Sequence, residues 1–216
     1  MSNFAVIFDM DGVIVDSNPY HKTALKQFAQ KYGYDLNEEE MKLKIYGRTN
    51  KEWIPNLFGE ISPEQVKIYA QEKEQLFRDL YKKAIEPFGG VKDFIIELEC
   101  QQIVKAIGTS APRENVDFVL EKCGLDFYFQ TILDESHVNH GKPNPEIYLK
   151  VAAALKFDPN RCIVFEDSLS GVKAAQDAGC KVVGITTTHT AEELAHTDLV
   201  IEDFFDLEIE QLEALF

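Results

Sequence analysis

Short apolar runs that alternate with helical patterns constrain the fold of this chain most. Six such runs suit strands that are buried on both faces of a parallel sheet, at 4–8, 103–107, 131–133, 162–165, 182–185 and, more weakly, 199–201. Between and after them, apolar residues recur at helical spacing in 91–98, 113–123, 145–155, 170–178 and 204–215. This alternation predicts an α/β fold with a doubly wound, Rossmann-like parallel sheet and right-handed crossovers.

One long stretch, from about residue 19 to 85, breaks the alternation. It contains no strand pattern but several helix starts, among them Asn18-Pro19 and the capping-box sequence Ser62-Pro63-Glu64-Gln65. Turn residues mark the departure from the sheet at 12–17 and the return at 87–90. We therefore expect an all-helical cap domain at 17–86, inserted after the first strand of a core domain made of 1–16 and 87–216.

Composition narrows the class of protein. A chain of 216 residues, 45% hydrophobic, can bury one substantial core and a smaller satellite domain. The net charge of −15, without any run of lysines or arginines, argues against nucleic acid and anionic membrane as partners. No targeting or membrane-spanning pattern is present, so we expect a cytoplasmic enzyme, and the mostly polar surface suggests a monomer.

The four widely spaced cysteines are expected to be reduced core thiols.

Polar residues stand directly after several predicted strands. Asp9 and Asp11 follow the first strand, Thr109-Ser110 the second and Glu166-Asp167 the fourth, while Lys142 lies in the loop after the third. Ligands of open α/β sheets bind beyond the carboxyl ends of the strands, so these side chains are expected to converge.

Together, these residues fit the requirements of a phosphoryl-transfer site. Asp9 is the expected nucleophile, because Mg²⁺ and the Lys142 ammonium would neutralise its charge and that of the phosphate. The expected Mg²⁺ ligands are Asp9, Asp167, Glu166 and a main-chain carbonyl of Met10 or Asp11. Thr109 and Ser110 would hold the transferring oxygens, and Asp11 would act as general acid and base.

Four segments resemble the motifs of the haloacid dehalogenase superfamily, in the same order. They are Asp9-Met10-Asp11-Gly12-Val13, Gly108-Thr109-Ser110, Gly141-Lys142-Pro143 and Phe165-Glu166-Asp167-Ser168. More narrowly, the chain is similar to the β-phosphoglucomutase-like subfamily, whose helical cap is inserted just after the first motif. The resemblance implies that Asp9 is phosphorylated in the intermediate and that Asp11 is the acid/base.

Candidate substrate contacts lie in the insertion and after the second strand. The resemblance implies that His21 couples substrate binding to Asp11, although the residue is also compatible with an ordinary helix histidine. Gly47-Arg48 forms part of a turn whose arginine either contacts a phosphate or is solvated. Lys73, on an apolar helix face, either snorkels or reaches the site. Ala111 and Arg113 are the candidates on the core side.

The motifs are shared by phosphatases and phosphomutases, and the cap distinguishes them. A mutase must hold a bisphosphate in two orientations and exclude water. β-Phosphoglucomutases carry a Lys-Gly-Val-Ser-Arg-like cap loop, whereas this chain has Tyr46-Gly47-Arg48-Thr49-Asn50. We therefore expect a phosphatase acting on a small phosphorylated metabolite such as a sugar phosphate. β-Phosphoglucomutase is the alternative, and a non-catalytic phosphometabolite sensor is a third.

Overall fold

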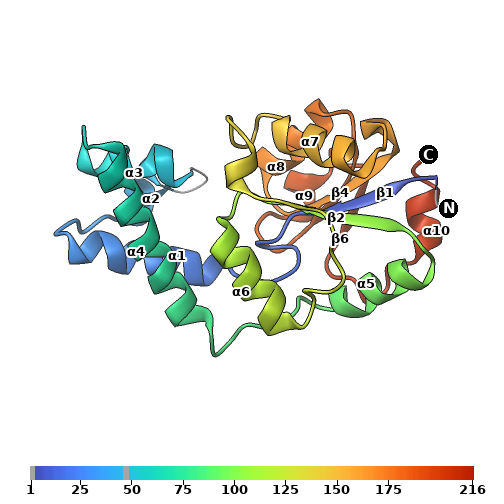
Figure 1. Cartoon of the computed structure of the whole chain (residues 1–216), viewed down its shortest axis with the longest axis horizontal. Helices are drawn as coiled ribbons and strands as arrows, with labels where there is room; N and C mark the ends of the chain where they lie inside the picture. The colour runs from blue at the N-terminus through green and yellow to red at the C-terminus, as the bar shows by residue number, and fades with distance from the viewer. Residues whose placement is uncertain (1–2, 46–48) are drawn as a thin grey trace. The chain divides into compact units, whose positions relative to one another are not determined.

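A six-stranded parallel sheet forms the centre of the computed structural model, which describes residues 3–45 and 49–216 (Figure 1). The strand order is β3-β2-β1-β4-β5-β6, and the predicted α/β fold is confirmed. The strands are β1 (Ala5–Phe8), β2 (Val104–Gly108), β3 (Ile132–Leu133), β4 (Cys162–Glu166), β5 (Lys181–Ile185) and β6 (Leu199–Ile201).

The strand order places a topological switch point beside β1. The chain moves from β1 to β2 and β3 on one side, then returns to lay β4 against the other side of β1, with Phe8 beside Phe165. Crossovers on the two sides leave the sheet in opposite directions, and ligands bind where this reversal occurs. Residues that follow β1 and β4 are therefore brought together.

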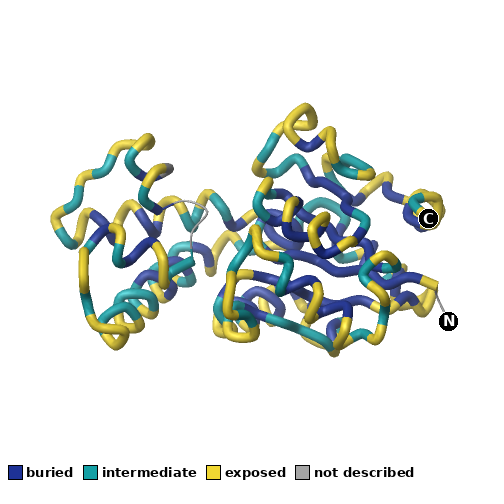
Figure 2. Tube along the Cα trace, turned by 90° about the horizontal axis from the view of Figure 1, so that it is seen from above, coloured by how far each residue is buried: buried dark blue, intermediate teal, exposed yellow. Residues whose placement is uncertain are grey.

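Helices cover both faces of the sheet. Figure 1 shows α7 (Glu146–Leu155) and α8 (Leu169–Asp177) on one face, and α5 (Val91–Cys100) and α6 (Arg113–Cys123) on the other. The central strands β1, β2, β4 and β5 are largely buried, as the dark tube at the centre of the sheet shows in Figure 2, whereas β3 and β6 at the two edges are half-buried. Because successive strand residues face opposite ways, Ala5 and Ile7 pack in the cluster that includes α7 and α8.

The other face of the sheet carries a cluster of five phenylalanines, Phe8, Phe94, Phe129, Phe165 and Phe204. Phe8 and Phe165 stack with ring centroids 5.2 Å apart, and Phe165 lies equally close to Phe204. The aromatic side chains fill the space between the sheet and α5.

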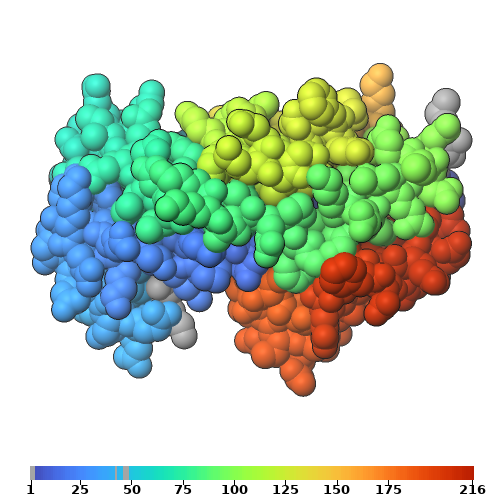
Figure 3. Space-filling model, turned by 90° about the horizontal axis from the view of Figure 1, so that it is seen from below, coloured from blue at the N-terminus to red at the C-terminus, as the bar shows by residue number. Residues whose placement is uncertain are grey.

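Phe204 also explains why the last helix is shorter than predicted. The sequence predicts a helix over 204–215, whereas α10 spans only Ile209–Glu213. The Phe204 amide donates instead to the Gly89 carbonyl at 2.8 Å. Gly90 has φ +75°, and a Cβ there would lie 2.8 Å from the Phe205 nitrogen, so the two segments approach closely. Figure 3 shows the C-terminal segment, in red, against the start of α5, in green.

The chain divides into two compact units, which we name the core unit (Met1–Asp16 with Ile85–Phe216) and the helical unit (Ser17–Ala84). The helical unit contains α1 (Asn18–Lys31), α2 (Glu38–Lys44), α3 (Asn50–Phe58) and α4 (Pro63–Tyr81), which form its own apolar core around Phe28 and Trp53. The Ser62 side chain caps α4 by accepting from the Gln65 amide at 3.1 Å. The remaining short elements are α9 (Ala191–Leu194) and the 3₁₀ turns Glu135–His137 and Pro159–Arg161.

The cysteines differ in exposure. Cys123, Cys162 and Cys180 are buried free thiols, as predicted, but Cys100 is exposed at the end of α5, so its prediction as a core thiol is wrong. Within the described residues, no helix has both the length and the apolar character needed to cross a membrane.

Candidate active site

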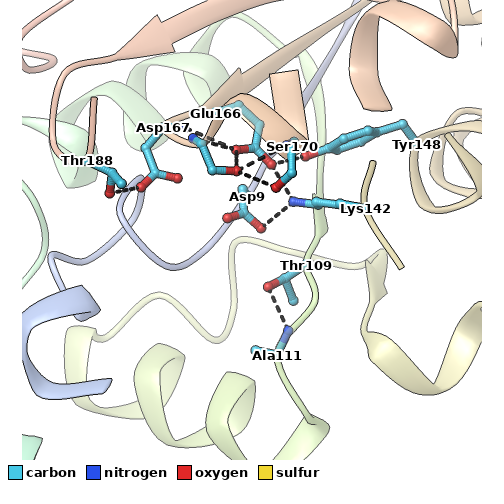
Figure 4. A network of polar contacts seen from close by, with 11 residues as sticks. Asp9, Thr109, Ala111, Lys142, Tyr148, Glu166, Asp167, Ser170 and Thr188 are labelled. Atoms are coloured by element: carbon cyan, nitrogen blue, oxygen red, sulfur yellow. Dashed lines mark hydrogen bonds and ion pairs between the residues drawn. The ribbon is translucent and has the colours of Figure 1, made fainter. Parts of the chain in front are cut away.

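Four ionisable side chains meet at the switch point (Figure 4). Asp9 follows β1, Glu166 ends β4 and is followed by Asp167, and Lys142 comes from the loop before α7. The Lys142 ammonium donates to Asp9 Oδ1 at 2.9 Å and to Glu166 Oε1. Only 7% of the Lys142 side chain and 10% of the Asp9 side chain are exposed. The structure thus brings together residues from three of the four predicted motifs.

The Glu166 carboxylate receives five hydrogen bonds. Oε1 accepts from Lys142 and from the Tyr148 hydroxyl at 2.6 Å. Oε2 accepts from the amides of Asp167 and Ser168, each at 3.1 Å, and from the Ser168 hydroxyl at 3.0 Å. Burial raises the pKa of Glu166, but Lys142 and these hydrogen bonds outweigh it and lower the pKa below the ordinary value.

In the other two carboxylates, Asp9 and Asp167, burial and neighbouring negative charges outweigh the attraction of Lys142, so the pKa is raised. Burial raises the pKa of Asp9 to about 7, against the attraction of Lys142 and with further repulsion from Glu166 and Asp11. Burial, together with the charges of Glu166 and Asp9, raises the pKa of Asp167 well above its ordinary value. The site therefore carries more negative charge than Lys142 alone balances.

This excess of buried negative charge fits a hard divalent cation such as Mg²⁺. One carboxylate oxygen from each of Asp9, Glu166 and Asp167 lies within 4.8 Å of the others, and oxygen ligands are those that Mg²⁺ prefers. Of the two main-chain carbonyls predicted as ligands, that of Met10 accepts the Ile14 amide at 2.9 Å and so serves the turn after β1.

The Asp11 and Thr109 segments lie in the core unit at the ends of β1 and β2. Asp11 is half-buried and precedes Gly12, whose φ of +81° permits the turn. Thr109 is buried and its hydroxyl accepts from the Ala111 amide at 3.1 Å, whereas Ser110 is exposed. Thr109 therefore shapes this loop in the structure.

Arg113 begins α6 and is placed on the surface. Its guanidinium donates to Asp117 Oδ1 at 2.7 Å, and both side chains are more than half exposed. In this arrangement Arg113 forms an ordinary ion pair along the helix.

Two of the predicted substrate contacts meet inside the helical unit. The Lys73 ammonium lies 3.2 Å from His21 Nδ1 and 2.8 Å from Glu74 Oε1. His21 stacks on Phe77 with ring centroids 3.6 Å apart. Lys73 is buried rather than snorkelling to solvent. The predicted contacts Gly47 and Arg48 lie outside the described residues.

Sequence reasoning missed Tyr148 and Thr188. The Thr188 hydroxyl donates to Asp167 Oδ2, and the neighbouring Thr187 hydroxyl donates to the Gly12 carbonyl at 2.5 Å. Both threonines follow β5. They therefore lie beyond the carboxyl end of a strand, as the other site residues do, and this position is the sequence signal that predicts them. Tyr148 occupies an apolar position of α7, and no pattern distinguishes its hydroxyl from that of any core tyrosine.

Comparison with known proteins places the chain among phosphoryl-transfer enzymes. The family described as haloacid dehalogenase-like hydrolase matches residues 6–185. A phosphorylated carbohydrates phosphatase of Thermotoga maritima is 35% identical over 180 residues, which cover 81% of each chain.

Solved structures extend the similarity to nearly the whole chain. A hydrolase described as family IA, variant 3, of this superfamily, from Entamoeba histolytica, is 36% identical, with a TM-score of 0.90 over 98% of each chain. A β-phosphoglucomutase from Clostridium difficile is 29% identical, with a TM-score of 0.82 over 98% of this chain and 96% of that one. The predicted resemblance to the superfamily and to β-phosphoglucomutase-like proteins is confirmed.

Proposed function

Because this chain belongs to the haloacid dehalogenase-like hydrolase family, we propose that it is a Mg²⁺-dependent phosphatase that acts on small phosphorylated metabolites through a phospho-Asp9 intermediate. The observation that carries the proposal is the contact of Asp9 with Lys142 inside a buried group of three carboxylates. A nucleophilic carboxylate needs such a balance of charge to approach a phosphate. Asp9, Asp167 and the Asp11 carbonyl are the proposed ligands, and bound Mg²⁺ would offset the charge on the phosphoryl oxygens.

The reaction then has two steps. In the first, an oxygen of Asp9 forms a bond to phosphorus, the bond from phosphorus to the substrate oxygen breaks, and Asp11 gives a proton to the departing oxygen. In the second, Asp11 takes a proton from water, whose oxygen attacks phosphorus and releases phosphate and the Asp9 carboxylate. Lys142 remains paired with Asp9 and lowers the repulsion between carboxylate and phosphate. Thr109 and Ser110 are the proposed holders of the phosphoryl oxygens.

A sugar phosphate is the proposed substrate class. The Thermotoga maritima relative is a phosphatase of phosphorylated carbohydrates, which supports that class for this chain. His21 and Lys73 are proposed to contact the substrate from the helical unit, with Gly47, Arg48, Ala111 and Arg113 as further candidates. A screen of phosphorylated metabolites with Mg²⁺ identifies the preferred compound through released phosphate.

The general activity is tested with p-nitrophenyl phosphate. We expect turnover that requires Mg²⁺ and is lost in Asp9→Asn, a substitution that keeps the shape of the side chain but removes its charge. Circular dichroism of the variant checks that it is folded. No turnover by the wild-type protein with p-nitrophenyl phosphate or any metabolite would contradict the proposed function.

β-Phosphoglucomutase activity is the second candidate. The buried position of Lys73 beside His21 in the helical unit supports it, because a mutase must hold a second phosphate and exclude water. Conversion of β-glucose 1-phosphate to glucose 6-phosphate, dependent on a catalytic bisphosphate, would support the mutase. Release of phosphate from the same compound without conversion would support the phosphatase.

A further inference from the structure

Glu166 is the most fully hydrogen-bonded group of the site. A carboxylate offers about four lone-pair sites, and the two oxygens of Glu166 receive donors from Lys142, Tyr148, Asp167 and twice from Ser168. Closeness to Asp9 and Asp167 makes Glu166 a candidate metal ligand. Its hydrogen bonds, however, already use the lone pairs that a cation would need.

The start of α8 is built to receive this carboxylate. A Cβ at Gly171 would lie 1.8 Å from Glu166 Oε1 and 2.3 Å from Oε2, so the carboxylate fills the space that any larger residue would take. The Ser168 hydroxyl, which donates to Glu166, also accepts from the Gly171 amide at 3.1 Å. The position favours a negative charge, because it lies at the N-terminus of a helix.

Tyr148 contacts both members of the Glu166–Lys142 pair. It is fully buried, its hydroxyl donates to Glu166 at 2.6 Å, and the Lys142 ammonium lies 5.0 Å from its ring centroid. A cation at that distance from an aromatic ring is attracted to it. Tyr148 thus limits where the ammonium can lie, while Figure 4 shows Lys142 pointing from this side toward Asp9.

We propose that Tyr148 is a positioning residue whose hydroxyl, together with the space left by Gly171, fixes Glu166 as the support of the Lys142 ammonium. Glu166 then acts on the phosphate through Lys142 and is not a ligand of the cation. The inference rests on the proposed function, because it requires that the Lys142 ammonium faces a phosphate.

The test compares Tyr148→Phe with the wild-type protein by calorimetric titration and by turnover. The titrants are Mg²⁺ alone and inorganic phosphate at saturating Mg²⁺, and the turnover substrate is p-nitrophenyl phosphate. We expect the Kd of phosphate to rise and kcat/KM to fall, each about tenfold, as for other residues that support a ligand. The Kd of Mg²⁺ should not change.

Tyr32→Phe is the matched control. It removes a tyrosine–carboxylate hydrogen bond of similar length, from Tyr32 to Glu72 Oε2 at 2.8 Å in the helical unit. All three measured quantities should stay at their wild-type values in this variant.

Two results would overturn the inference. An unchanged phosphate Kd in Tyr148→Phe would make the hydroxyl a purely structural feature, and a loss of Mg²⁺ affinity equal to the loss of phosphate affinity would make Glu166 a metal ligand. If the wild-type protein binds phosphate but turns over no phosphate ester, the proposed function fails while the titrations still decide the inference.

Gly171→Ala provides a second variant that removes no polar group. Alanine is normally the better helix residue, so a rise in thermal stability with unchanged phosphate Kd would also contradict the inference. We expect the added Cβ to displace the Glu166 carboxylate and to weaken phosphate binding as Tyr148→Phe does.

Discussion

At the scale of single residues, two lysines of the described part of the chain form ion pairs in which both partners are buried, one lysine in each unit. Lys142 pairs with Asp9 and Glu166 in the core unit, and Lys73 pairs with Glu74 in the helical unit. Buried ion pairs add little net stability, but breaking one leaves an uncompensated charge and is costly. Replacement of one partner in either pair is therefore expected to impair folding or function.

Glu74 is expected to make the helical unit sensitive to acid. Burial raises its pKa, but Lys73, His21 and a hydrogen bond from Asn50 outweigh burial and lower the pKa from 4.5 to about 2. A carboxyl whose pKa is lower in the folded state stabilises the fold above its unfolded pKa, and this contribution is lost as the pH falls from 4.5 toward 2. The shift corresponds to about 3 kcal/mol of the free energy of unfolding.

Glu74→Gln should therefore lower the free energy of unfolding at pH 7 by about 3 kcal/mol, and by less as the pH approaches 2. Trp53, the only tryptophan of the chain, lies in the helical unit and reports its urea unfolding by fluorescence. Glu72→Gln removes a partly exposed pair with Lys31 and should cost less than about 1 kcal/mol at either pH. A loss for Glu74→Gln that is the same at both pH values would contradict this account.

The sequence predicts site residues well where their position follows from a strand end. Asp9, Glu166 and Asp167 stand at or directly after strands, so the α/β rule alone brings them together. The hydroxyl of Tyr148 is different, because its partner depends on how α7 packs over the sheet. Sequence periodicity marks Tyr148 as a core residue but carries no information about the carboxylate that it meets.

At the scale of elements, the strands follow the sequence pattern closely and the C-terminal helix does not. The strands are set by short apolar runs between turns, which are local signals. Residues 204–208 carry a helical pattern, yet Phe204 packs in the phenylalanine cluster and its amide bonds to the Gly89 carbonyl. A tertiary contact with a segment more than one hundred residues away thus overrides the local preference.

Phe204→Ala and Phe205→Ala test the role of this segment. Phe204 is 3% exposed and Phe205 is 71% exposed, so adjacent residues provide a matched comparison. Phe204→Ala should lower the free energy of unfolding by about 3–5 kcal/mol, and Phe205→Ala should change it by less than about 0.5 kcal/mol. Urea unfolding followed by far-ultraviolet circular dichroism gives both values. Equal effects would show that the segment is not anchored through Phe204.

At the scale of the whole molecule, the helical unit is inserted between β1 and β2, and the four ionisable side chains of the candidate active site belong to the core unit. Asp9, Lys142, Glu166 and Asp167 all belong to the core unit, whereas His21 and Lys73 belong to the helical unit. The motifs therefore predict the proposed chemistry. The choice of substrate depends on other side chains, whose contacts no short motif predicts.

The most direct test of the account is to trap the phosphoryl group on Asp9. p-Nitrophenolate leaves without needing a proton, so Asp11→Ala should still be phosphorylated by p-nitrophenyl phosphate, while the loss of the general base slows hydrolysis. With Mg²⁺, we predict a burst of about one p-nitrophenolate per chain. Mass spectrometry after acid quenching should find one phosphoryl group on Asp9 and none in the Asp9→Asn, Asp11→Ala double variant. A phosphoryl group on another residue, or turnover that survives the loss of Asp9, would contradict the account.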